Sequence, residues 1–217
     1  PRERALLRRL VGVEARRRGT LRALLRHFAS RQPNPDLAVH LHLGLAQAFF
    51  FDRIPDHALV SETVALVHVR LGPGPARFAN AVLRAALKAR VAGASGDPRR
   101  DLLLRPWHLA EPVFHDPSKH PLLWAEDALS MPAVIFKRWQ KRLGGERALA
   151  LALQALEDPP LSLRAVRVPR DDLRAELQAE GLHPREGGHP AILLVPTEES
   201  AGALASSALR EGRATVQ

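Results

Sequence analysis

The stretch of sequence that decides the fold runs over residues 55–88: residues 55–70 read PDHALVSETVALVHVR, residues 72–75 read GPGP, and residues 76–88 read ARFANAVLRAALK. Pro55 stands where the first turn of a helix tolerates proline, because the N–H group at that position has no partner within the helix. The Gly-Pro repeat is typical of a turn. In the last segment, apolar residues recur at helical spacing. The stretch therefore predicts two helices joined by a turn.

Three further helices are predicted upstream. Apolar residues recur at helical spacing over residues 6–13, 21–28 and 36–51. Between the first two segments, Gly19 and Thr20 are interpreted as a break, with Thr20 as a candidate cap of the second helix. Five helices joined by short breaks predict an all-α bundle at the start of the chain.

The rest of the chain divides by pattern. The bundle is assigned to residues 1–92, and the Gly- and Pro-rich residues 93–130 to a connector that Trp107, Phe114 and Trp124 hold against a neighbouring surface. The region 131–217 predicts two linker helices and a small α+β domain, so the fold class is mostly α. Helices are expected at residues 131–143, 145–157 and 170–180. Strands are expected at residues 161–168, where apolar and polar residues alternate, and at residues 191–195.

The composition excludes several kinds of site within these 217 residues. Cysteine is absent, which excludes disulfides, thiolate metal sites and cysteine nucleophiles. No apolar run approaches the ~20 residues of a membrane span, and the arginine-rich start does not resemble a signal peptide, which favours a cytoplasmic protein without a membrane partner. His40 and His42 are two residues apart on a predicted helix and so face different directions, and no metal site is expected. No glycine-rich nucleotide loop or nucleophile elbow occurs, so no catalytic residue is assigned.

Positive charge is concentrated in the first part of the chain. Residues 1–90 hold 16 of the 32 Lys+Arg residues but only 6 of the 23 Asp+Glu residues, and the net charge of the whole chain is +9. A part this basic is typical of a protein that binds a polyanion, and the planar guanidinium of arginine suits phosphate. The alternative is a solvated outer face without a partner. The candidate RNA-binding residues in this part are Arg4, Arg8, Arg9, Arg16, Arg17, Arg18 and Arg22.

A second basic cluster lies in the predicted helix at residues 131–143. Four cations follow the spacing i, i+1, i+4 and i+5 and so share one face of the helix. Trp139 lies on another face, which we expect to enter the core. The basic face either contacts RNA or is simply solvated. Its candidate residues are Lys137, Arg138, Lys141 and Arg142.

Several motifs resemble those of one known family. Residues 51–64, FDRIPDHALVSETV, resemble the RIP-x-H-A…ETV signature of the RsmB/Fmu (Sun)-type bacterial rRNA cytosine-5 methyltransferases. Residues 78–84, FANAVLR, look like the N-(A/G)-V-L-R helix of that family. The same two segments are similar, in looser form, to NusB, the transcription antitermination factor. Residues 159–164, PPLSLR, and 212–217, GRATVQ, resemble segments that precede the catalytic domain of the methyltransferases.

The resemblance implies a NusB-like RNA-binding fold with rRNA as the partner. It also implies that the chain is the N-terminal part of a methyltransferase, with a first helix missing and the S-adenosylmethionine domain and its catalytic cysteines following residue 217. The expected function is to position small-subunit rRNA for that domain, with no cofactor held by this chain. The sequence departs from the family in lacking asparagines before Pro159 and after Arg164.

Three residues of the signature are expected to be structural: Arg53, Glu62 and Asn80. Because Glu62 and Asn80 sit on otherwise apolar helices, we expect a buried hydrogen-bonded pair. Two alternatives stay open for the chain as a whole. One is a stand-alone NusB-type RNA-binding and antitermination factor, which would need nothing beyond about residue 95. The other is a helical protein-interaction module, which would show no salt-sensitive RNA binding.

Overall fold

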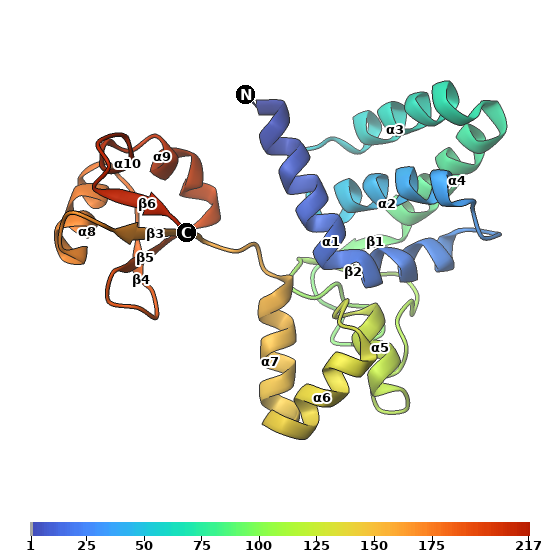
Figure 1. Cartoon of the computed structure of the whole chain (residues 1–217). Helices are drawn as coiled ribbons and strands as arrows, with labels where there is room; N and C mark the ends of the chain where they lie inside the picture. The colour runs from blue at the N-terminus through green and yellow to red at the C-terminus, as the bar shows by residue number, and fades with distance from the viewer. Residues whose placement is uncertain (1) are drawn as a thin grey trace. The chain divides into compact units, whose positions relative to one another are not determined.

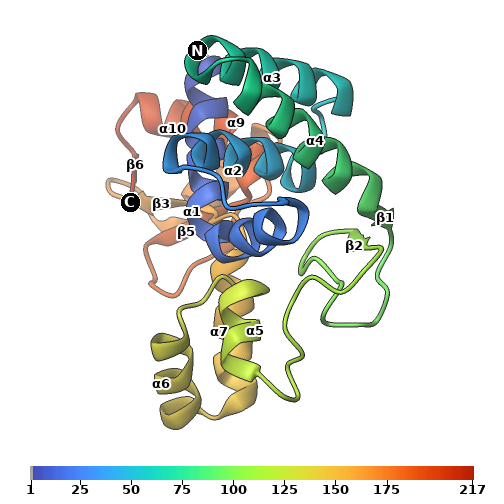
Figure 2. The same cartoon turned by 90° about the vertical axis from the view of Figure 1, so that its right-hand side faces the viewer.

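The computed structural model describes residues 2–217 and divides the chain into two compact units, residues 1–156 and residues 157–217. The first unit opens with the helices α1 to α4, which Figure 1 shows from blue to green. Helix α2 packs against each of the other three, as two views of the bundle show (Figures 1 and 2). The four helices are α1 (Arg2–Phe28), α2 (Pro35–Phe50), α3 (Asp56–Leu71) and α4 (Pro73–Ala89).

Local sequence explains where α2 and α4 begin. The side chain of Asn34 accepts a hydrogen bond from the backbone N–H of Leu37 at 2.8 Å, and Pro35 occupies the first turn of α2. Only Gly72 separates α3 from α4, with a φ of 92° that favours glycine, and Pro73 already belongs to α4. The predicted turn at residues 72–75 is thus shorter than expected, because its prolines start the next helix.

The first helix is continuous, so the predicted break at Gly19 and Thr20 is wrong. Thr20 is buried within the helix, where its hydroxyl donates to the carbonyl of Asp127 at 2.9 Å and its backbone N–H donates to the hydroxyl of Ser130 at 3.0 Å. Gly19 lies so close to α5 (Pro121–Asp127) that an added Cβ would be 1.9 Å from the carbonyl oxygen of Glu126. Glycine serves here for close approach between two segments and not as a helix terminator.

Residues 90–156 complete the first unit. Strand β1 (Arg90–Ala92) pairs antiparallel with β2 (Trp107–Leu109), and α5 is followed by α6 (Ala133–Leu143) and α7 (Gly145–Leu156). The two linker helices were expected near these positions. The expected division of the chain at residues 92 and 130 differs from the packing, because Leu102, Phe114 and Trp124 of the connector and Phe136 and Ala148 of the linker helices belong to the same core as the bundle.

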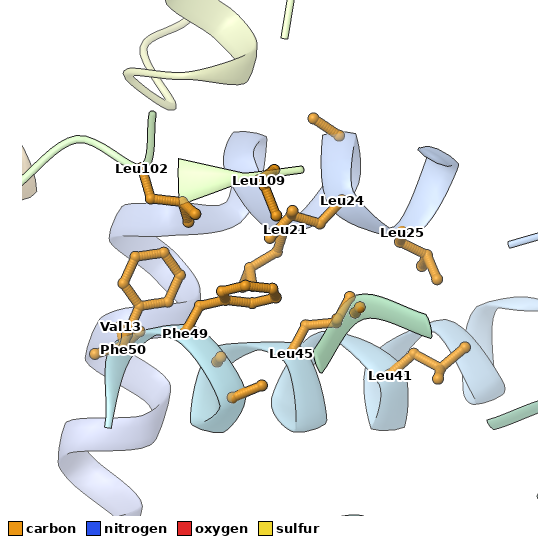
Figure 3. Close-up of a cluster of buried hydrophobic side chains, with 14 of the residues drawn as sticks. Val13, Leu21, Leu24, Leu25, Leu41, Leu45, Phe49, Phe50, Leu102 and Leu109 are labelled. Atoms are coloured by element: carbon orange, nitrogen blue, oxygen red, sulfur yellow. The ribbon is translucent and has the colours of Figure 1, made fainter. Parts of the chain in front are cut away.

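The centre of this core joins segments far apart in the sequence. Figure 3 shows Leu21 and Leu24 of α1, Leu45 and Phe49 of α2 and Leu109 of β2 gathered in one cluster. All five side chains are completely buried. Each such side chain contributes about 1.5–3 kcal/mol through its burial. The connector is therefore part of the hydrophobic core and not a loose tether, as its aromatic residues predicted.

The second unit is a small α+β domain, as expected. Its four strands form an antiparallel sheet in the order β4-β5-β3-β6, and Leu163 and Leu193 from its two central strands form one core with Leu173 and Leu177 of α8. The predicted helix and two strands are present, whereas two shorter strands and three short helical turns were not predicted. The elements are β3 (Leu161–Ala165), α8 (Arg170–Ala179), β4 (Arg185–Glu186), β5 (Ile192–Val195), η1 (Thr197–Glu199), α9 (Ser200–Leu204), α10 (Ser207–Arg210) and β6 (Ala214–Val216).

The expected buried pair of Glu62 and Asn80 does not form. Glu62 is exposed on the outer side of α3. Asn80 is half-buried, and its side-chain oxygen accepts a hydrogen bond at 2.9 Å from Arg84, one turn further along α4. Arg53 is exposed in the loop between α2 and α3. A hydrogen bond within one helix thus takes the place of the predicted bond between helices.

Candidate nucleic-acid interface

A row of exposed arginines follows one face of α1. Positions three or four residues apart share a face of a helix, and the row continues through the exposed Val11 and Ala15. At 1.5 Å per residue, the row is roughly 33 Å long. These residues, called the α1 stripe below, are Arg4, Arg8, Arg18, Arg22 and Arg26.

The stripe depends on the continuity of α1. With the predicted break at Gly19 and Thr20, Arg4 and Arg8 would lie on one helix and Arg22 and Arg26 on another, with no fixed relation between the two. Because α1 is a single helix of 27 residues, the two groups lie on the same face. The structure thus combines the predicted residues into one long surface that a single polyanion can follow.

Two other predicted residues lie off the stripe. The guanidinium carbon of Arg9 is 5.0 Å from the centre of the Phe51 ring, which is a cation–π contact. Arg16 is half-buried, and its guanidinium lies beside Gly12, on a side of α1 turned away from the stripe. Arg9 and Arg16 therefore form a second line on α1.

Arg17 is a correction to the predicted set of RNA contacts. Arg17 is only 6% exposed, and its Nη1 donates a hydrogen bond to the carbonyl oxygen of Leu103 at 3.0 Å. The guanidinium carbon lies 4.9 Å from the centre of the Phe50 ring. Arg17 thus ties α1 to the connector, because its position on the helix faces the protein interior and not solvent.

Replacing Arg17 by methionine is expected to lower the free energy of unfolding by about 1–3 kcal/mol, because the carbonyl of Leu103 loses its charged donor. Arg8→Met is the matched control, since Arg8 is exposed on the same helix, and its change should stay within about 0.5 kcal/mol. Urea unfolding measures both. An Arg17→Met chain of unchanged stability but weakened RNA affinity would restore Arg17 as an RNA contact.

The middle of the stripe borders a partly buried charge cluster. Arg18 donates two hydrogen bonds to Glu14, at 3.0 and 2.7 Å, and His42 of α2 lies 3.5 Å from the same carboxylate. The hydrogen bonds from Arg18 hold the pKa of Glu14 below its usual value, whereas burial lowers the pKa of His42. Glu14 is therefore ionised and His42 is neutral near pH 7, so the cluster has no net charge, and Arg18 contributes less positive potential to the stripe than its other arginines do.

The second predicted cluster lies on α6. Lys137, Arg138, Lys141 and Arg142 are all exposed, while Phe136 is buried at 4% exposure. Trp139 is half-buried and packs against the core, as predicted. The division of α6 into a basic face and a packing face is thus present. Contact of this face with RNA stays a prediction.

Arg31 is a further cation near the end of α1 that the prediction does not include. It lies between α1 and α2, where helical spacing gives no information, and its guanidinium carbon is 5.7 Å from the centre of the Phe78 ring. The sequence signal for it is only the general arginine content of this part. Its position beside the stripe follows from the way α2 folds back on α1.

Within residues 2–217 no helix is both long enough and apolar enough to cross a bilayer. The described side chains also include no group of three or more His, Asp or Glu residues that could hold a metal ion.

Comparison with known proteins shows which domain family the first unit contains. Residues 1–88 match the model of the NusB family, which covers the four-helix part of the first unit. The crystal structure of PH0851 has the same fold, with a TM-score of 0.60 and 15% sequence identity. That likeness covers 98% of this chain and 44% of the other. The chain thus has a NusB domain followed by further helices and a small α+β unit.

One curated relative is similar over most of this chain and not only over its NusB domain. The chain is 26% identical over 188 residues to the probable ribosomal RNA small subunit methyltransferase B of Bacillus subtilis (strain 168). The match covers 85% of this chain and 37% of that protein, so the chain spans little more than a third of the relative's length. The resemblance to the N-terminal region of Sun-type methyltransferases is thereby confirmed.

Proposed function

We propose that this chain binds rRNA and positions it for a methyl-transfer domain of the RsmB/Fmu type. The observation that carries the proposal is the α1 stripe, which lies on a NusB domain in a chain related to an rRNA methyltransferase. The basic face of α6 supplies a second set of cations within the same compact unit. In this proposal the 217 residues contribute no cysteine nucleophile, since they contain no cysteine, and S-adenosylmethionine binds to the methyl-transfer domain and not to them.

The physical basis is the release of counterions from RNA. Each cation that neutralises a phosphate releases condensed salt ions, which gives affinity without reading the sequence of bases. An arginine guanidinium can donate two parallel hydrogen bonds to one phosphate. A rigid helix that holds several guanidinium groups in a row meets successive phosphates with little loss of backbone freedom.

The test is fluorescence anisotropy of a labelled small-subunit rRNA fragment with the whole 217-residue chain at 50 and 200 mM salt. We expect the affinity to fall by at least ~10-fold between these two concentrations, as several phosphate contacts require. Absence of binding, or binding that salt does not change, would contradict the proposal and favour a helical protein-interaction module.

A further inference from the structure

A pocket of about 580 Å³ lies between the C-terminal part of α1 and the start of α2. This volume is in the range of small-molecule sites in proteins. Its walls come from residues 22–33 and from Ala38 and His42, so the chain forms the pocket by folding back on itself. None of its lining residues is acidic.

The two parts of the pocket differ in character. Leu25 is buried, and Ala29, Pro33 and Ala38 are half-buried, so together they form an apolar wall. The other lining residues are polar or charged: Arg22, Arg26, Arg31, Gln32 and His42. An apolar wall beside several cations suits a ligand with one flat apolar part and one anionic part.

Neighbouring residues hold most of the cations in place. Arg26 donates to the carboxylate of the buried Asp127 at 2.9 Å, and Arg31 lies over the Phe78 ring. Among the side chains that the structure describes, Arg22 forms no ion pair, and its charge is available to a ligand. A pocket whose groups are already ordered loses less entropy when a ligand binds.

We propose that this pocket binds one unstacked nucleotide of single-stranded RNA, with the base on the apolar wall and the phosphate between Arg22 and Arg31. The inference rests on the proposed function, because Arg22 and Arg26 belong both to the pocket and to the α1 stripe. An RNA strand that follows the stripe therefore passes the mouth of the pocket. A base enters only where it is unpaired, and specific recognition of RNA generally uses such splayed bases.

The amide of Gln32 is the exposed neutral side chain of the pocket that both donates and accepts hydrogen bonds, since His42 is half-buried and its Nδ1 lies 3.5 Å from Glu14. An amide of this kind can pair with the polar edge of a base, whereas the arginines can only donate. Gln32 is therefore the residue that would give the pocket a preference among bases. The stripe itself distinguishes no sequence.

The experiment compares three RNAs with the whole chain by fluorescence anisotropy: a 12-nucleotide single strand, the same strand with every base removed, and a duplex of equal length. We expect the single strand to bind about 10-fold more tightly than the abasic strand, because burial of a base against the apolar wall adds affinity that phosphates do not. The duplex should behave like the abasic strand at equal salt.

Two variants test the pocket directly. Ala38→Leu reduces the space beside the apolar wall, and Arg31→Gln removes one cation without touching the stripe. Each variant should weaken binding of the single strand by about 10-fold, because each removes a contact with the bound nucleotide. Ala38→Leu should change binding of the abasic strand by no more than about twofold, because that strand has no base to place on the apolar wall. The matched controls are Ala81→Leu and Arg70→Gln, which change exposed residues of α4 and α3. The controls should bind every RNA as the unaltered chain does.

The outcomes separate the pocket from the proposed function. If the chain binds RNA with strong salt dependence but does not distinguish the abasic strand, the pocket inference is overturned and the stripe stands. If both pocket variants bind like their controls, the pocket is overturned in the same way. If cytidine monophosphate alone binds as tightly as the single strand, the pocket binds a free nucleotide and not a nucleotide within an RNA strand, and the inference is overturned. If no RNA binds, both proposals fail.

Discussion

Replacing Gly19 by alanine is expected to destabilise the first unit by about 3 kcal/mol, the upper end of the usual cost of overpacking. The added Cβ would lie 1.9 Å from the carbonyl oxygen of Glu126 and 2.8 Å from Cα of Ser130. Both are backbone atoms, which cannot rotate away as a side chain can. The two segments would have to separate, which would also lengthen the hydrogen bonds that Thr20 makes to Asp127 and Ser130.

A second glycine of α1 supplies the control for this variant. The atoms nearest to a Cβ at Gly12 would belong to the guanidinium of Arg16, the first at 3.2 Å, and that group is the flexible end of a side chain. Gly12→Ala should therefore stabilise the unit by about 0.5–1 kcal/mol through helix propensity. If α1 packs as described, urea unfolding should show a lower free energy of unfolding for Gly19→Ala and a higher one for Gly12→Ala. Equal stability changes for the two would show that α5 does not lie against Gly19.

The double charge reversal Arg4→Glu with Arg8→Glu is expected to weaken RNA binding on the order of 100-fold at 100 mM salt, because it removes two phosphate contacts and adds repulsion. Both residues are exposed on the first part of the α1 stripe, away from the hydrophobic core. Arg4 lies in the first turn of α1, where an acidic residue is favourable, and Arg8 is exposed, so the fold should keep its stability. The slope of log affinity against log salt should become shallower by roughly 1.4, at ~0.7 for each lost contact with a single strand.

The control for the stripe carries the same change of net charge elsewhere. Arg70→Glu with Arg77→Glu alters two exposed arginines of α3 and α4. If the stripe is the binding surface, this control should weaken RNA binding by no more than about threefold through long-range charge. An equal loss in both double variants would mean that total charge, and not the α1 stripe, determines the affinity.

Local patterns were sufficient for most of the elements. Helical spacing of apolar residues predicted α2, α4, α6 and α7, because a helix that buries one face needs that spacing wherever it packs. Period-two alternation predicted β3 for the same reason. The basic face of α6 was also predicted, since four cations at fixed spacing share a face of any helix. The motifs around Pro55 and Asn80 were enough for the NusB resemblance, which the comparison over residues 1–88 confirms.

Long-range contacts decided what the local patterns could not. Gly19 and Thr20 look like a break because glycine and threonine favour helix ends, yet contacts with residues more than 100 positions away explain both. Arg17 has the same chemistry as Arg18 beside it, and only the packing of α1 makes one buried and the other exposed.

The sequence by itself determined most of the longer helices, the two central strands of the small sheet, the basic character of the first part and the resemblance to a family, because each of these is carried by neighbouring residues. The tertiary structure alone decided that α1 is continuous and that its arginines form one stripe. It also brought α5, α6 and α7 into the first core and formed the pocket between α1 and α2. These features depend on which segments meet in space, and that depends on the packing of the whole unit.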